Sequence, residues 1–278
     1  MVKTSVKKRT TNRKKSKKST NRVKQIVFFF LILLFGLTTY HYRNAILYYL
    51  SFKTDKIVKQ DKVTQARIYQ ILQDNKEKVI GFDVSEYQGD IDWDEVDSIE
   101  GKELKFVFIR ATMGNDRVDA KFKENWKKAK QHKFIRGAYH YYRPNENSID
   151  QAELFIKTVQ LSNGDLPPVL DIEKLPKTQS IDSLKIGLKR FLNKIDSHYK
   201  IKPIIYSGEK YYEDFLKDEF KGYTFWVANY NFFVENIKDE WTFWQFTEKG
   251  VINGINEKVD INIYNGTPKM LNYLTISN

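Results

Sequence analysis

The sequence contains no cysteine, which excludes a disulfide scaffold, a thiolate metal site and a cysteine nucleophile. Other catalytic motifs are also missing. No glycine-rich phosphate loop follows an apolar run, and no serine stands in a G-x-S-x-G elbow. The histidines have no H-x-x-H spacing; they are His41, His132, His140 and His198. The sequence therefore disfavours a Ser-His-Asp triad and a zinc site, and it predicts no cofactor.

Acidic residues are absent before Asp55, whereas residues 1–25 hold eleven Lys and Arg. The formal net charge of +12 is therefore local, because from Asp55 onward 34 basic residues stand against 35 acidic ones, a net charge of −1. A basic tail of this kind can contact nucleic acid or acidic lipid. The segment beside it decides between these partners.

That segment, Ile26 to Tyr40, is a run of fifteen residues without a charge. Counted through Tyr42 it reaches the ~17 residues that a spanning helix needs, with Lys24 and Arg43 at its ends. The cations on its amino side predict a cytoplasmic tail over residues 1–25, a transmembrane anchor over 26–42 and an extracytoplasmic remainder. Membrane lipid is thus an expected partner and nucleic acid is not.

Two other interpretations of this run are a buried core helix and a cleaved signal peptide. The cationic tail beside it argues against a buried core helix. A cleaved signal peptide is the stronger alternative, because its apolar region spans ~7–15 residues. The residues after the run offer no small-x-small cleavage site, which favours an uncleaved anchor.

The rest of the chain divides into two regions with different residue patterns. Residues 43–78 predict a helical stalk, since 51–78 lack Gly and Pro and are rich in Lys, Gln and Asp. Residues 79–278 alternate β-rich apolar runs with helix-length segments, which predicts an α/β fold with parallel strands. The seven runs are Val79–Val84, Phe106–Ala111, Gly137–Tyr142, Pro168–Ile172, Ile201–Tyr206, Phe225–Ala228 and Trp241–Phe246. Seven or eight strands, with fewer helices after Tyr206, predict an irregular (β/α) TIM-like barrel preceded by the transmembrane helix.

Polar side chains at the strand ends are the candidates for chemistry, because barrel sites form at the carboxyl ends of strands. They are Asp83, Arg110, His140, Tyr141, Asp171, Glu173, Tyr206, Asn229, Gln245 and Asp260. Asp171 and Glu173 form the sharpest pair. Strand residues i and i+2 share a face, ~6–7 Å apart, so PVLDIE directs both carboxyls into one space while Ile172 points into the packing layer. Like charges raise the pKa of one carboxyl, as glycosidic cleavage requires; the other interpretation is a structural pair held by Arg110 or Arg143.

Aromatic residues gather around the same strand ends and favour a sugar substrate. Their flat faces suit pyranose rings, and Tyr, Asn and Gln can bind hydroxyl groups. The set is Tyr87, Tyr139, Tyr141, Tyr142, Tyr206, Trp226, Tyr230 and Trp244, of which Trp226 and Trp244 are expected in the barrel core.

Five segments in this order resemble glycoside hydrolase family 25, the lysozymes that cleave peptidoglycan. They are GFDVSEYQGDIDW, FVFIRATMG, GAYHYYRP, PVLDIE and FWQF…VDIN, and the resemblance runs from about Gly81 to Gly266. It implies a β-1,4-N-acetylmuramidase whose partner is the peptidoglycan glycan strand. Glu173 would be the general acid, Asp171 would lie beside the anomeric carbon, and Asp83 and Asp260 would complete the acidic floor. One departure is Met113, where the family's Lys-x-Thr-Glu-Gly-like run has an acid.

The sequence is compatible with two mechanisms and with other functions. The substrate's 2-acetamido oxygen could attack the anomeric carbon, with Asp171 orienting it. Alternatively, a carboxylate such as Asp260 could activate water with inversion. An inactive wall-binding module would not need the acids, and hydrolysis of chitin or another glycan would use the same chemistry.

Overall fold

The computed structural model describes residues 17–51 and 62–277 of the 278-residue chain. These residues fall into two compact units, divided between Ser51 and Phe52. The first consists of helices α1 (Lys17–His41) and α2 (Arg43–Ser51). Within α1, Arg22–His41 is long and apolar enough to cross a membrane. Helix α1 covers residues 26–41 of the expected span 26–42, while its insertion into a membrane stays a prediction.

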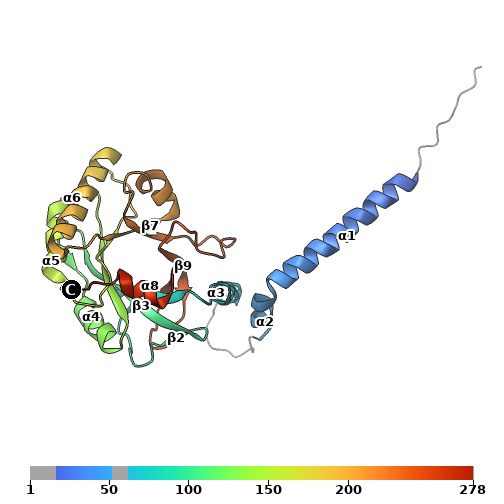
Figure 1. Ribbon diagram of the computed structural model, residues 1–278, viewed down its shortest axis with the longest axis horizontal. Coiled ribbons are helices and arrows are strands. Elements are labelled where there is room, and N and C mark those ends of the chain that lie inside the picture. The colour runs from blue at the N-terminus through green and yellow to red at the C-terminus, as the bar shows by residue number, and fades with distance from the viewer. Residues whose placement is uncertain (1–16, 52–61, 278) are drawn as a thin grey trace, which may run out of the picture. The chain divides into compact units, whose positions relative to one another are not determined.

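Eight strands of the second unit close into a barrel, in the order β1-β10-β9-β8-β7-β6-β5-β3 and back to β1 (Figure 1). They are β1 (Val79–Val84), β3 (Lys102–Met113), β5 (Ile135–Tyr141), β6 (Val169–Asp171), β7 (Ile204–Gly208), β8 (Thr224–Ala228), β9 (Phe243–Gly250) and β10 (Val259–Tyr264). Seven are parallel, and β10 alone runs antiparallel to both of its neighbours. Two short strands, β2 (Ser98–Ile99) and β4 (Arg117–Val118), pair with β3. The predicted barrel is confirmed.

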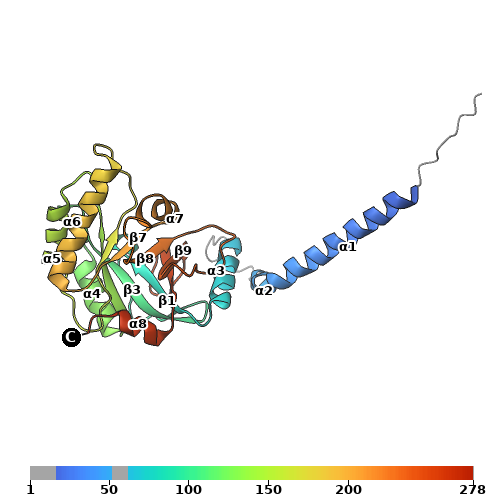
Figure 2. The same cartoon turned by 45° about the horizontal axis from the view of Figure 1, so that its top comes forward.

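Helices cover the outside of the first half of the barrel, as Figure 2 shows. They are α4 (Phe122–Gln131), α5 (Ser148–Thr158) and α6 (Ile181–Tyr199). Between β7 and β10, the only helices among the described residues are the short α7 (Glu209–Tyr211) and the π-helical turn η2 (Tyr212–Leu216). The last helix, α8 (Pro268–Leu274), follows β10 and places Leu271 in the barrel interior. The thinning of helices after Tyr206 agrees with the sequence.

Helix α3 (Lys62–Asp74) corrects the C-terminal part of the stalk predicted over residues 43–78. Residues 52–61 of that predicted stalk lie outside the described part of the chain. Its apolar side chains Ile68, Ile71 and Leu72 are fully buried in the core of the second unit. Arg67 donates from Nη1 to the carbonyl of Phe246 on β9 at 3.2 Å. Residues 62–74 therefore belong to the barrel domain, and α3 covers the outer side of β9.

The barrel walls separate two apolar layers. Inside lies an aromatic cluster that includes Phe106, Phe108, Trp226 and Phe243, in which the Phe108 and Trp226 rings stack with centroids 4.4 Å apart. Outside, the larger cluster joins strands to helices and includes Trp244. The expectation that Trp226 and Trp244 are core residues is confirmed. This filled interior closes the barrel from below and leaves its upper end for a site.

Candidate active site

A cavity of about 920 Å³ opens at the carboxyl edge of the parallel strands. All four predicted catalytic carboxyls line it: Asp83, Asp171, Glu173 and Asp260. Seven of the eight predicted binding residues line it too: Tyr87, Arg110, Tyr139, Tyr141, Tyr206, Asn229 and Gln245. Residues 160 or more positions apart in the sequence thus meet in one place.

Asp83 and Asp260 face each other in register across β1 and β10. The sequence placed Asp260 at a strand's carboxyl end, and this was wrong: it is the second residue of β10. Because β10 runs antiparallel, its amino end lies at the carboxyl edge of the other strands. Asp83 Oδ2 accepts hydrogen bonds of 2.8 Å from Gln245 Nε2 and from Asn262 Nδ2.

Burial dominates the electrostatics of this pair. It raises the pKa of Asp83 to about 7, against the hydrogen bonds from Asn262 and Gln245, which lower it. The pKa of Asp260 rises to about 9, through burial first and then through repulsion from Asp83 and Glu248. At neutral pH the two carboxyls therefore still hold a proton between them.

Asp171 and Glu173 leave the end of β6 on the same side of the chain. Ile172 between them is fully buried in the outer apolar layer, and its amide donates to the Tyr206 carbonyl at 3.0 Å. Ser207 Oγ in turn donates to the Ile172 carbonyl at 2.6 Å, which keeps the segment extended beyond the strand. Asp171 and Glu173 thus both line the cavity while Ile172 lies in the packing layer, as the alternation predicts.

The two carboxyls differ in environment. Asp171 is buried, and its Oδ1 has no hydrogen-bond partner among the described residues. Burial, followed by repulsion from Glu173 and Asp83, raises the pKa of Asp171 well above its ordinary value. The Glu173 carboxyl is open to the cavity. Partial desolvation by the protein nevertheless raises its pKa, and the nearby charge of Lys174 opposes this increase. One carboxyl is thus fixed and the other can reach a substrate.

Amide side chains organise the floor of the cavity. Gln245 accepts a hydrogen bond of 2.7 Å from the Tyr206 hydroxyl and another from Tyr230, while its Nε2 holds Asp83. Asn262 accepts from Trp226 Nε1 at 2.8 Å and donates to Asp83. Asn262 was missed from the sequence, although VDIN places it two residues after Asp260 and hence on the same face.

His140 is a wrong prediction among the binding residues. It is fully buried outside the barrel, where its ring stacks on Phe191 of α6 with centroids 4.9 Å apart. Its two ring nitrogens contact Thr112 Oγ1 at 2.7 Å and Gln151 Oε1 at 3.1 Å. Burial lowers the pKa of His140 to about 4, so the ring is neutral. Neighbouring strand residues alternate faces, and Tyr139 and Tyr141 point into the cavity instead.

An α/β barrel with carboxyls clustered at the carboxyl edge of its strands has the architecture of a glycosidase. The chain belongs to the glycosyl hydrolases family 25, whose sequence pattern matches residues 82–255. It is a glycoside hydrolase of the lysozyme class.

Individual relatives agree with this assignment. The chain is 40% identical to the protein YegX of Escherichia coli K12 over 194 residues, 69% of this chain and 71% of that protein. It is 31% identical to lysozyme M1 of Streptomyces globisporus over 209 residues, 69% of this chain and 70% of the other. A family 25 glycosyl hydrolase structure from Bacillus anthracis matches with a TM-score of 0.65 at 30% identity, covering 73% of this chain and 95% of that one.

Proposed function

We propose that this protein is a membrane-anchored lysozyme that hydrolyses the β-1,4 bond between N-acetylmuramic acid and N-acetylglucosamine in peptidoglycan. The observation that carries the proposal is the meeting of Asp83, Asp171, Glu173 and Asp260 in one cavity. The likeness to lysozyme M1 supports the choice of substrate. The tyrosines and amides around the four acids would bind the sugar rings and their hydroxyl groups.

Glu173 is the general acid in this proposal. Its carboxyl is open to the cavity and its pKa is raised, so a proton is available to the leaving oxygen. Asp171 orients the 2-acetamido group, because its unpartnered Oδ1 is free to accept the acetamido N–H. Asp83 and Asp260 form the floor beneath the sugar.

The reaction proceeds in two steps. The acetamido oxygen attacks the anomeric carbon as the glycosidic bond breaks, and Glu173 gives its proton to the departing oxygen. Water then attacks the cyclic intermediate, and the Glu173 carboxylate takes a proton from that water. The acetamido group is restored, and the configuration at the anomeric carbon is retained.

Inversion with Asp260 as the base is less compatible with the site. A general base must be ionised at the working pH. Burial and repulsion raise the pKa of Asp260 to about 9, which keeps its carboxyl protonated near neutrality. We therefore favour the mechanism assisted by the substrate.

The location is part of the proposal. Helix α1 would act as an uncleaved anchor, with residues 1–25 in the cytoplasm and the barrel outside. The eleven cations before the apolar run support this orientation. A secreted protein after signal cleavage is the alternative.

The specificity is tested by mass spectrometry of peptidoglycan digested with the full-length protein. Muramic acid at the new reducing ends is the expected product, with chitin as a control substrate that stays intact. Glucosamine at those ends would identify a glucosaminidase and refute the proposed bond. Release of soluble sugars from chitin but not from peptidoglycan would refute peptidoglycan as the substrate.

A further inference from the structure

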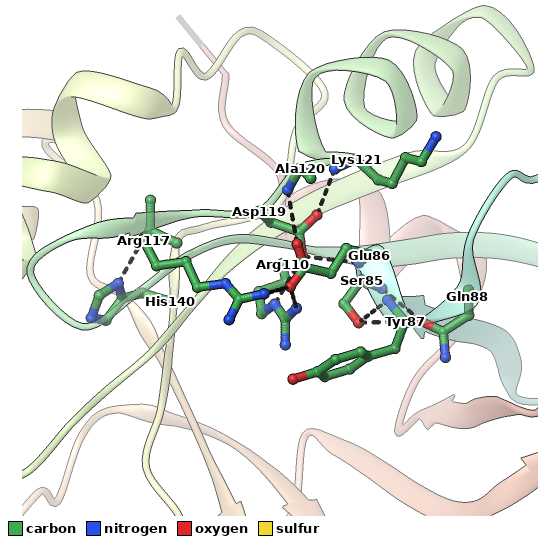
Figure 3. Close-up of polar contacts among 11 residues, drawn as sticks. Ser85, Glu86, Tyr87, Gln88, Arg110, Arg117, Asp119, Ala120, Lys121 and His140 are labelled. Carbon is green, nitrogen blue, oxygen red and sulfur yellow. Dashed lines mark hydrogen bonds and ion pairs between the residues drawn. The ribbon is translucent and has the colours of Figure 1, made fainter.

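Tyr87 is an unusual wall residue of the cavity because it is both exposed and held in place. Its side chain is 66% exposed, yet one face of its ring lies against the buried guanidinium of Arg110, with Cζ 4.5 Å from the ring centroid. The ring belongs to the short 3-10 turn η1 (Glu86–Gln88), which follows β1. Figure 3 shows this ring beside Arg110 at the edge of the polar cluster.

Glu86, the residue before Tyr87, ties this turn to three places on and after β3. Its Oε1 accepts from Arg110 Nη2 at 3.1 Å and from Arg117 Nη2 (Figure 3). Its Oε2 accepts from the amide of Ala120 at 3.1 Å. Only 14% of the Glu86 side chain is exposed. One carboxylate thus fixes both the turn that carries the ring and the guanidinium that supports it.

Asp119 completes the attachment from the other side. Its Oδ2 accepts from the Glu86 amide and from Arg110 Nε, each at 2.9 Å. The Arg110 and Asp119 side chains are 6% and 1% exposed. Ser85 adds a capping box, in which its hydroxyl accepts from the Tyr87 amide and its own amide donates to Gln88. The turn is therefore anchored through main chain and side chains together.

We propose that Glu86 is a positioning residue that sets Tyr87 as a fixed aromatic platform for a pyranose ring of the glycan strand. This inference rests on the proposed function, since the ligand is the same polysaccharide. Arg110 covers one ring face from behind, and the exposed face is left for the sugar. A side chain that is already ordered loses little conformational entropy on binding, so its stacking contributes more fully to affinity.

The chemistry of the ligand follows from the wall that Tyr87 occupies. The same cavity holds Asp83 and Asp171, so a sugar cleaved there belongs to a chain that passes this ring. The C–H face of a pyranose is apolar and matches an aromatic face in size. A contact away from the reacting bond binds substrate and transition state alike, which changes KM and leaves kcat.

A double-mutant cycle on the full-length protein tests this inference, with soluble peptidoglycan strands as the substrate. Tyr87→Ala should raise KM about 10-fold and Glu86→Gln about 3- to 10-fold, each with kcat within about twofold of wild type. The double variant should match Tyr87→Ala, because Glu86 acts only through the ring. Multiplied effects, or a loss of kcat without a change in KM, would overturn the inference.

A second readout does not depend on turnover. Amide hydrogen exchange over residues 85–88 should speed up in Glu86→Gln. It should stay unchanged in Asp90→Asn, a matched control that removes the exposed ion pair with Lys121 after the same turn. Unchanged exchange in Glu86→Gln would refute its anchoring role. If that variant does not fold, Arg117→Gln removes one cation from the same oxygen and should raise both KM and exchange to a smaller extent. A wild-type protein that releases no reducing ends overturns the proposed function, and the exchange comparison still decides the role of Glu86.

Discussion

Asp83, which is buried, and Asp260, which is half-buried, form an acidic pair whose effect on stability changes with pH. Their pKa values, about 7 and about 9, lie above the ordinary value of 3.8, with burial as the first cause. A carboxyl whose pKa is higher in the folded state binds protons more tightly there than in the unfolded chain. Its contribution to stability is complete below pH ~4 and is lost as pH rises through the folded-state pKa.

We therefore expect Asp260→Asn to raise the melting temperature at pH 8 and to leave it nearly unchanged at pH 4.5. In the wild type this carboxyl ionises above pH ~4 in the unfolded chain but keeps its proton in the fold up to its raised pKa, so the fold loses stability across that range. An amide cannot ionise in either state, so the variant escapes this loss at pH 8. Thermal unfolding at both pH values measures this difference. Asp239→Asn, at an exposed carboxyl, is the control and should show no such dependence. Equal shifts at the two pH values would contradict the raised pKa.

Asp171 and Glu173 should separate by their response to the leaving group. An aryl glycoside with a good leaving group needs little protonation, so Glu173→Gln should be far less impaired on it than on peptidoglycan. Asp171→Asn should be impaired on both substrates, because orienting the acetamido group does not depend on the leaving group. Steady-state kinetics on an accepted aryl glycoside make the comparison. Equal impairment of Glu173→Gln on the two substrates would argue against its role as the acid.

At the scale of elements, the barrel strands could be predicted because β-branched and aromatic runs such as Val79–Val84 carry their own signal. The direction of β10 could not, since short runs do not encode whether a strand pairs parallel or antiparallel. The sequence does not show that helix α3 packs on the barrel, because its loose helical spacing fits a solvated helix and a packed one equally. The outer side of β9 decides in favour of packing. Within the described residues no long helix follows β9 to cover this side, so the apolar residues of α3 pack there.

Some residues of the site could likewise be predicted from the sequence, and others could not. Carboxyls at strand ends could be located from sequence, since a strand end brings its residue to the catalytic edge of a barrel. His140 lies in the same motif but faces outward, because neighbouring strand residues alternate faces and Tyr139 and Tyr141 take the inward positions. Asn262 is not among the sequence candidates, because its role depends on hydrogen bonds to Asp83 and Trp226, which lie far from it in the sequence.

Helix α3 should behave as part of the barrel. Ile71→Ala removes a fully buried side chain and should lower the free energy of unfolding by ~2–5 kcal/mol. Val63→Ala on the same helix changes a side chain that is 53% exposed and should cost less than ~0.5 kcal/mol. Denaturant titration of both variants provides the test. A negligible effect of Ile71→Ala would restore the stalk interpretation.

For the whole molecule, charge and hydropathy divide the chain along its length. The cations of residues 1–25 precede an apolar helix, and the rest carries a net charge near zero. This asymmetry predicts that protease added outside intact cells or spheroplasts sheds the barrel and spares the basic tail. N-terminal sequencing of the released and retained products measures the outcome. A free mature protein beginning between residues 38 and 55 would establish a cleaved signal peptide.

The release of reducing ends from purified peptidoglycan by wild type and by Glu173→Gln tests the catalytic assignment most directly. Glutamine keeps the shape of the side chain but has no proton acidic enough to donate. Turnover should therefore fall ~10²–10⁴-fold, with substrate binding and the melting temperature near wild type. Near-normal release by Glu173→Gln would show that another group donates the proton. A loss of several degrees in melting temperature by both Glu173→Gln and Asp171→Asn would show that these carboxyls form a structural pair.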